Sequence, residues 1–316
     1  MRSSKQPMSL DIPAMGMTGG HVAEAVDRLH RVPGRHREFV QDARRAAREH
    51  GISPALLNQL GDLGLPSQHV DGAHRYDRID LANVALALRL PNARAMAMRG
   101  WANSLSVTAG TGSSFFEVEV EAHCPAPGHP GGCAYELSDA LRSLEGYEPR
   151  DEVRSGTLRR RMPRPESAAP PHARELAELV RPLHYHLLPE ALRADLGFLE
   201  ETGLADCALA AAFLTREAGA RGLDARYSNG IFLALPYSMT HTWMEVRDGD
   251  SWTALDPHLL HLLTDWSLLN PADWPPYRSI GGCTVRVAER DVWLVTHRGA
   301  CAVLSLTTRC SPADLG

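Results

Sequence analysis

Two β-rich segments on either side of a glycine turn constrain the fold of this chain more than any other feature. Residues 241–246 and 251–255 are rich in β-branched and aromatic side chains. Between them lies Asp248-Gly249, a dipeptide typical of a two-residue type I′ turn. The pattern therefore predicts an antiparallel β-hairpin.

The expected register of this hairpin places a histidine beside a carboxylate. With Asp248-Gly249 as the loop, Arg247 pairs with Asp250, and His241 stands directly opposite Asp256. Directly opposite side chains have Cβ atoms about 4.5–5.5 Å apart. A carboxylate at that distance fixes the tautomer of an imidazole and raises its basicity. A three-residue loop would break this register.

A cysteine begins the strongest helix-forming segment of the sequence. Residues 207–214 are almost all alanine, leucine and phenylalanine, and Asp206 precedes them as the expected N-cap. Cys207 is therefore expected in the first turn, where free N–H groups and the helix dipole favour a thiolate. The charge of Asp206 opposes this effect, so a nearby imidazolium is also needed.

These residues together resemble the transglutaminase-like superfamily. Its motifs match Asp206-Cys207, residues 222–226, residues 241–246 and residues 252–257, in the same order and with the same spacing. The resemblance implies a papain-like α+β fold in which Cys207 is the nucleophile, His241 the base and Asp256 the orienting carboxylate. It also implies acyl transfer through a thioester. The calcium-ligand runs of the animal enzymes are absent, so metal dependence is not implied, and we expect no cofactor. The backbone N–H of Cys207 and a side chain near Tyr185–His186 are the candidate oxyanion donors.

The N-terminal part predicts a helix–turn–helix. One helix is expected from His36 to His50, with Phe39 and Val40 on its apolar stripe. Gly51 is expected to end it, and Ser53 is expected to cap a second helix. Together with residues 63–65, 75–76 and 80–81, this passage loosely resembles the winged-helix head of MerR-type regulators. Residues 57–59 differ from that family, which has aromatic and arginine side chains there.

Charge favours a docking role over DNA binding for this part. Residues 21–105 contain 12 arginines and 9 acidic residues, a small excess for a DNA-binding surface. The net charge of the whole chain is −5. We therefore expect this domain to bind a peptide or a carrier, with DNA binding unlikely.

The domain organisation follows from changes in composition. Residues 159–161 are three arginines in a proline-rich stretch, which is typical of a linker. Residues 115–121 alternate and predict a strand. The expected order is a disordered tail (1–20), a helix–turn–helix-like docking domain (21–105), a strand-containing connection (106–149), a linker (150–173) and a transglutaminase-like catalytic domain (174–316).

A loop after the predicted strand contains four soft ligands, His123, Cys124, His129 and Cys133. Such side chains bind zinc, but their spacing matches no common zinc pattern. We therefore expect no metal site. The six cysteines do not form a disulfide framework in a chain of this length, and no apolar run reaches the roughly 20 residues of a membrane helix. We expect a cytoplasmic protein that does not bind a membrane.

The expected function is cysteine-dependent acyl transfer, either amide or peptide formation or its hydrolysis. Because 32 of the 33 basic residues are arginine, we expect a bacterial source, and the docking domain suggests specialised metabolite or peptide biosynthesis. The sequence does not choose between water and an amine as acceptor. The alternative is a MerR-like transcription regulator whose C-terminal domain senses a ligand without catalysis.

Overall fold

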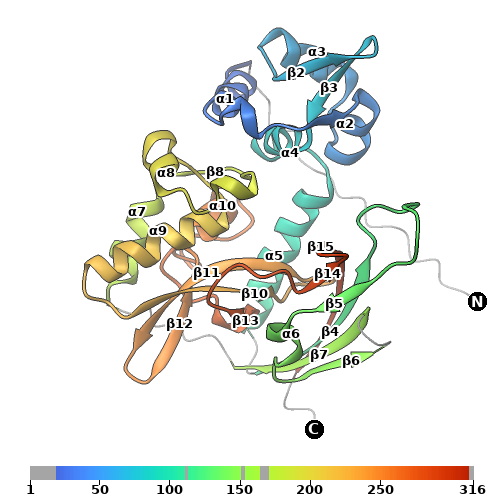
Figure 1. Ribbon diagram of the computed structural model, residues 1–316. Coiled ribbons are helices and arrows are strands. Elements are labelled where there is room, and N and C mark those ends of the chain that lie inside the picture. Colours follow the sequence, from blue (N-terminus) through green and yellow to red (C-terminus); the bar gives the residue numbers. More distant parts are fainter. Residues whose placement is uncertain (1–18, 111–112, 151–153, 164–170, 313–316) are drawn as a thin grey trace, which may run out of the picture. The chain divides into compact units, whose positions relative to one another are not determined.

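The computed structural model describes residues 19–110, 113–150, 154–163 and 171–312 (Figure 1). The chain divides into two compact units, Met1–Asn92 and Ala93–Gly316. Both combine helices with antiparallel sheets, so the α+β class is confirmed. Within the described residues, no helix has both the length and the hydrophobicity that crossing a bilayer requires.

The first unit is a small helical domain with a three-stranded sheet of order β1-β3-β2. Its apolar core is formed by side chains such as Leu29, Leu60 and Leu81, which are fully buried. Its elements are α1 (Gly19–His30), η1 (Gly34–His36), β1 (Phe39–Gln41), α2 (Ala43–His50), α3 (Pro54–Asp62), β2 (Ser67–Val70), β3 (Ala73–Asp77) and α4 (Arg78–Ala87).

Two helices, α2 and α3, lie in the segment where two helices were predicted, but the first begins later than expected. Phe39 and the residue after it belong to strand β1, which pairs with β3, and α2 begins only after Asp42. Asp42 decides this boundary because its carboxylate accepts a hydrogen bond from the N–H of Arg45 at 2.8 Å. Gly51 ends α2 with a φ of 71°, and Ser53 caps α3 as expected.

The second unit is built around a four-stranded antiparallel sheet of order β12-β11-β10-β13. Helix α9 packs along β11 and β10 (Figure 1). Apolar side chains of α7, such as Leu176, share the same core. These elements are α7 (Ala173–Val180), α8 (Leu196–Thr202), α9 (Cys207–Ala220), β10 (Ala225–Phe232), β11 (Met239–Asp248), β12 (Ser251–Leu255), α10 (Pro257–Asp265), η3 (Gly281–Cys283) and β13 (Thr284–Ala288).

A second four-stranded sheet, of order β16-β4-β7-β6, shares a core with β10 and β13. The predicted strand at residues 115–121 is confirmed as the middle of β4, where every second side chain from Phe116 to Ala122 is buried. The remaining elements are α5 (Ala93–Gly110), β4 (Ser114–His123), β5 (Tyr135–Leu137), α6 (Asp139–Arg142), β6 (Tyr147–Arg150), β7 (Ser155–Met162), β8 (His184–Tyr185), η2 (Glu190–Leu192), β9 (Leu204–Ala205), β14 (Val295–His297), β15 (Ala300–Cys301) and β16 (Val303–Pro312).

The structure differs from the expected domain boundaries at three places. Helix α5 belongs to the second unit, although residues up to 105 were expected in the first. Residues 106–149 contain strands β4, β5 and β6 of that unit and do not form a connection. Strand β7 lies inside the expected linker. Residues 151–153 and 164–170 of that linker lie outside the described residues, as does most of the expected tail.

Ion pairs explain why the arginine run is a strand. Within β7, Arg159 binds Glu117 of the neighbouring strand β4 at 2.8 Å and Glu148 of β6 at 2.7 Å. Leu158, the residue before it, is fully buried. A paired strand whose outer face carries charged side chains can therefore have the same composition as a linker.

The close approach of two strands at Gly230 gives a test of the central sheet. A Cβ on Gly230, which pairs with His241, would lie 2.1 Å from the carbonyl oxygen of Val285 in β13. We expect Gly230→Ala to lower the free energy of unfolding by about 1–3 kcal/mol through overpacking. Chemical denaturation followed by circular dichroism measures this.

The matched control is Gly219→Ala in the last turn of α9, where an added Cβ meets nothing within 4 Å. This change is expected to stabilise the protein by about 0.4–1 kcal/mol, because alanine restricts the unfolded chain. Equal denaturation midpoints for the two variants would contradict the tight packing at Gly230.

Candidate active site

Cys207 is the first residue of α9, and buried polar contacts fix the chain just before it. Strands β8 and β9 pair in parallel, and β9 leads directly into Asp206. The carboxylate of Asp206 accepts a hydrogen bond from the N–H of Leu209 at 3.0 Å and pairs with Arg193 at 3.1 Å. The expected N-cap is therefore confirmed, and the half-buried thiol of Cys207 lies in the first helical turn.

His241 and Asp256 form a buried pair. The Nε2 atom of His241 lies 2.6 Å from Oδ2 of Asp256, and both side chains are at most 5% exposed. The second oxygen of Asp256 accepts a hydrogen bond from the N–H of Leu259 at 2.9 Å and thereby caps α10. The carboxylate thus has no freedom to rotate away from the imidazole.

The hairpin that carries this pair has a different register from the expected one. Asp248 pairs with Ser251, so the two loop residues are Gly249 and Asp250. Gly249 has a φ of 59° at the first loop position, where a type II′ turn requires a glycine.

His241 and Asp256 are consequently diagonal neighbours and not direct partners. The last pair of the ladder is Met244 with Leu255, after which the chain leaves the strand for α10. The true register differs from the predicted one by an even number of residues. Because side chains alternate with a period of two, the predicted common face is retained.

Contacts with Cys207 and Asp256 raise the pKa of His241 to about 10. Burial is the largest influence and lowers this pKa, because it disfavours the charged imidazole. The negative charge of Cys207 and hydrogen bonds to both Asp256 and Cys207 outweigh burial. Since Nε2 binds the carboxylate, Nδ1 is the nitrogen left for the sulfur. The structure thus brings the three predicted residues together, while their catalytic roles remain a prediction.

Aromatic rings enclose His241 on several sides. Trp101 of α5 and Phe232 of β10 lie 5.2 and 5.6 Å from the imidazole, measured between ring centroids, and Trp243 lies 6.4 Å away. Trp101 and Trp243 are at most 2% exposed. This apolar enclosure keeps bulk water from the imidazole, so its interactions with charged groups are less screened.

Two tyrosines lie close enough to Cys207 to respond to its charge. The pKa of Tyr185 is raised well above its ordinary value, first by burial and then by the negative charge of Cys207. Burial also raises the pKa of Tyr227, together with its hydrogen bond of 2.5 Å to Asp291. The Tyr185 ring stacks on His258 with centroids 5.3 Å apart, which fixes its orientation.

The hydroxyl of Tyr227 belongs to a small polar network. Asn229 donates hydrogen bonds to Asp291 at 3.2 Å and to Thr242 at 3.1 Å. Tyr227 donates to the same oxygen of Asp291. The Oδ1 atom of Asn229 is buried and has no hydrogen-bond partner. The hydroxyl proton of Tyr227 is therefore already used in a hydrogen bond to the carboxylate of Asp291.

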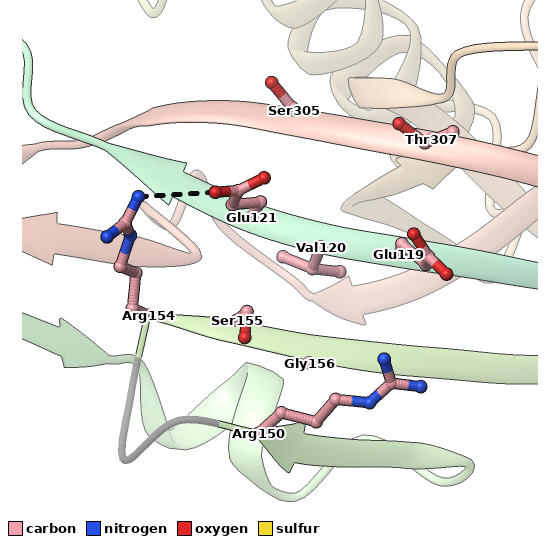
Figure 2. Close-up of a pocket in the computed structure, with 9 residues that line it drawn as sticks. All are labelled: Glu119, Val120, Glu121, Arg150, Arg154, Ser155, Gly156, Ser305 and Thr307. Atoms are coloured by element: carbon pink, nitrogen blue, oxygen red, sulfur yellow. Dashed lines mark hydrogen bonds and ion pairs between the residues drawn. The ribbon is translucent and has the colours of Figure 1, made fainter.

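The hollow drawn in Figure 2 lies on the second sheet, and none of its lining residues belongs to the Cys207 site. It is lined by residues of β4, β7 and β16, by Arg150 at the end of β6 and by Arg154 just before β7. Glu121 and Arg154 form an ion pair of 3.3 Å at one end of this group of residues. With no cysteine and no imidazole among its lining residues, this hollow lacks the groups of a thiol-dependent site.

Several residues of the site were missed at the sequence level. Trp101 lies more than a hundred residues before Cys207, and no local motif links it to His241. Asp291 follows β13 in a segment of ordinary composition. Tyr185 was named only as part of a region from which an oxyanion donor could come. Its two-residue strand is too short to produce a recognisable pattern.

No family model matches the chain, and no curated protein matches it. Among solved structures, it is similar to a "putative cysteine protease from Cytophaga hutchinsonii" at 10% sequence identity. The match covers 65% of this chain and 93% of the other, with a TM-score of 0.34. A TM-score of this size does not establish a shared fold.

The charge of Cys207 gives a test of the coupling within the site. We expect Cys207→Ser to lower the pKa of His241 from about 10, because the strongest influence that raises it is removed while burial still lowers it. An NMR titration of the imidazole, assigned with His241→Gln, measures this. The wild-type ring should stay protonated at pH 8, and the variant ring should lose its proton at a lower pH than the wild-type ring. Identical titration curves would exclude charge coupling between the two side chains.

Proposed function

We propose that this protein is a thiol-dependent acyl-transfer enzyme that forms a thioester on Cys207. The observation that carries the proposal is the chain of contacts from Cys207 through His241 to Asp256. A thiol at a helix N-terminus, a buried imidazole and a fixed carboxylate have the roles of nucleophile, base and orienting group in acyl transfer.

The proposed reaction has two steps. The Cys207 thiolate attacks the carbonyl carbon of an amide or ester, and the imidazolium of His241 gives its proton to the leaving amine or alcohol as the thioester forms. Water or an amine then attacks the thioester, the C–S bond breaks to release the Cys207 thiolate, and His241 takes the proton from this second nucleophile. Water yields hydrolysis, and an amine yields a new amide. Asp256 holds the imidazole throughout through Nε2.

The proposed function makes a prediction about thiol reactivity. Below pH 7, we expect iodoacetamide to alkylate Cys207 much faster than it alkylates glutathione, the reference thiol in the same mixture. The reason is that the imidazolium of His241 stabilises the thiolate. Cys301, an exposed thiol, should react no faster than glutathione. Peptide mass spectrometry over a pH series measures all three rates.

Two further measurements separate catalysis from mere reactivity. His241→Gln should reduce the alkylation of Cys207 below pH 7 to the rate of glutathione. Intact-protein mass spectrometry with a small acyl thioester should detect an acyl group on the wild type and none on Cys207→Ala. Alkylation of Cys207 at the ordinary rate in the folded wild type would overturn the proposal.

We further propose that the backbone N–H of Cys207 and the hydroxyl of Tyr185 stabilise the oxyanion. Support comes from the response of the Tyr185 pKa to the charge of Cys207 and from the free N–H groups of a helical first turn. Tyr185→Phe is expected to lower kcat by about 10²–10³-fold with little change in KM.

Tyr227→Phe is the matched control for this prediction. It also removes a hydroxyl close to Cys207, but one whose proton is already bonded to Asp291. We expect its effect on kcat to be much smaller. Equal losses in the two variants would contradict the oxyanion role of Tyr185. Stopped-flow mass spectrometry of acyl-enzyme formation measures the rate constant for each of the two variants.

For the first unit we propose a docking role, in which it presents a peptide or a carrier-bound acyl group. The exposed residues of α3 include Asn58 and Gln59, and its one exposed charge is that of Asp62. A helix without cations has nothing to pair with phosphates, so a regulator that reads DNA through α3 is disfavoured. A bacterial pathway of peptide or metabolite biosynthesis fits this arrangement.

A further inference from the structure

Four potential metal ligands from distant parts of the second unit come together outside the Cys207 site. They are Cys124, His129, Cys133 and His297, and their donor atoms all lie within 4.8 Å of one another. Cys124 follows β4, His129 and Cys133 lie in the loop before β5, and His297 ends β14. His123, grouped with this loop from the sequence, instead lies 2.9 Å from the hydroxyl of Ser305.

Two of the distances between these atoms match those of a tetrahedral metal site. The Nε2 atoms of His129 and His297 are 3.3 Å apart, and Sγ of Cys133 lies 3.7 Å from Nε2 of His129. With Zn–N bonds near 2.05 Å and Zn–S bonds near 2.3 Å, tetrahedral geometry gives about 3.3 Å between two nitrogens and about 3.6 Å between sulfur and nitrogen.

Neighbouring groups orient the ligands as they do in zinc proteins. The Nδ1–H of His129 donates a hydrogen bond to the carbonyl oxygen of Pro130 at 3.1 Å, so Nε2 carries the lone pair that faces the other ligands. Tyr135 of β5 hydrogen-bonds the side chain of Cys133. The His297 ring is 4% exposed and packs edge-on against Tyr135, with centroids 5.0 Å apart.

The loop that supplies two ligands is also held in place by Arg298, the residue after the fourth ligand. Its side chain donates hydrogen bonds to the carbonyl oxygens of Pro130 at 3.1 Å and Gly132 at 2.6 Å. Its backbone N–H donates to Ala134 at 3.0 Å. The protein therefore fixes the loop against β14 with the four donor atoms facing one another.

We propose that Cys124, His129, Cys133 and His297 bind one Zn²⁺ in a closed structural site. Four protein ligands fill the tetrahedral shell and leave no position for water or substrate, so the metal has no role in acyl transfer. The ion joins the loop between β4 and β5 to a strand more than 160 residues later in the sequence. Such a crosslink restricts the unfolded chain and stabilises the native state.

The test uses the full-length protein purified under reducing conditions from cells supplied with zinc. We expect about one Zn²⁺ per chain by mass spectrometry of the metal. Cobalt exchanged into the site should give the intense visible absorption of a tetrahedral cobalt thiolate. Cys133→Ser and His297→Ala should lose both signals. Cys301→Ser and Cys207→Ala should keep both, since neither residue is a proposed ligand.

The wild type alone also tests the proposal, whatever happens to the folding of the variants. Chelation should lower its melting temperature, added zinc should restore it, and the exposed Cys133 should resist alkylation only while the metal is bound. Absence of stoichiometric zinc in the folded protein would overturn the proposal. A Cys124–Cys133 disulfide found by non-reducing peptide mapping of protein purified without reductant, with no zinc bound in either preparation, would also overturn it. None of these readouts depends on acyl-transfer activity.

Discussion

The carboxylate of Asp256 joins the end of a strand, the start of a helix and the imidazole of the candidate site. One oxygen caps α10 and the other binds His241 at 2.6 Å. A buried carboxylate must have its hydrogen-bonding capacity satisfied, because its desolvation is otherwise costly. The same contacts that make its burial tolerable also fix the angle between β12 and α10. Local chain geometry and the orientation of the base therefore depend on a single group.

Local patterns predicted that the three residues come together, because Cys207 and Asp256 lie at the starts of helices and His241 lies on a strand of the predicted hairpin. Asp206 caps the Cys207 helix as its sequence indicates, and the hairpin forms between the predicted segments. The register was wrong because Asp248-Gly249 and Gly249-Asp250 are both good turn dipeptides, and sequence alone does not choose between them. The pairing of His241 with Asp256 survived because alternation preserves the face of a strand whenever the register changes by two.

Long-range packing explains what the sequence did not reveal. Trp101 encloses His241 from a helix that composition assigned to the other domain, and His297 joins three ligands that lie far earlier in the chain. Neither contact leaves a periodic or spacing signal in the sequence. The arginines of β7 were misread for a related reason, because their partners in β4 and β6 are not sequence neighbours.

Strand β16 pairs with β4 along ten consecutive residue pairs, from Val303 with His123 to Pro312 with Ser114. The α9 helix and the sheet that carries His241 are encoded between these two strands. During synthesis, β4 therefore leaves the ribosome long before β16, and one of its edges stays unpaired until β16 has been made. An exposed β edge is prone to pair with other chains, and distant strand pairing slows folding. The alternating glutamates of β4 place negative charge on this unpaired strand, and the repulsion between these charges disfavours association between nascent chains.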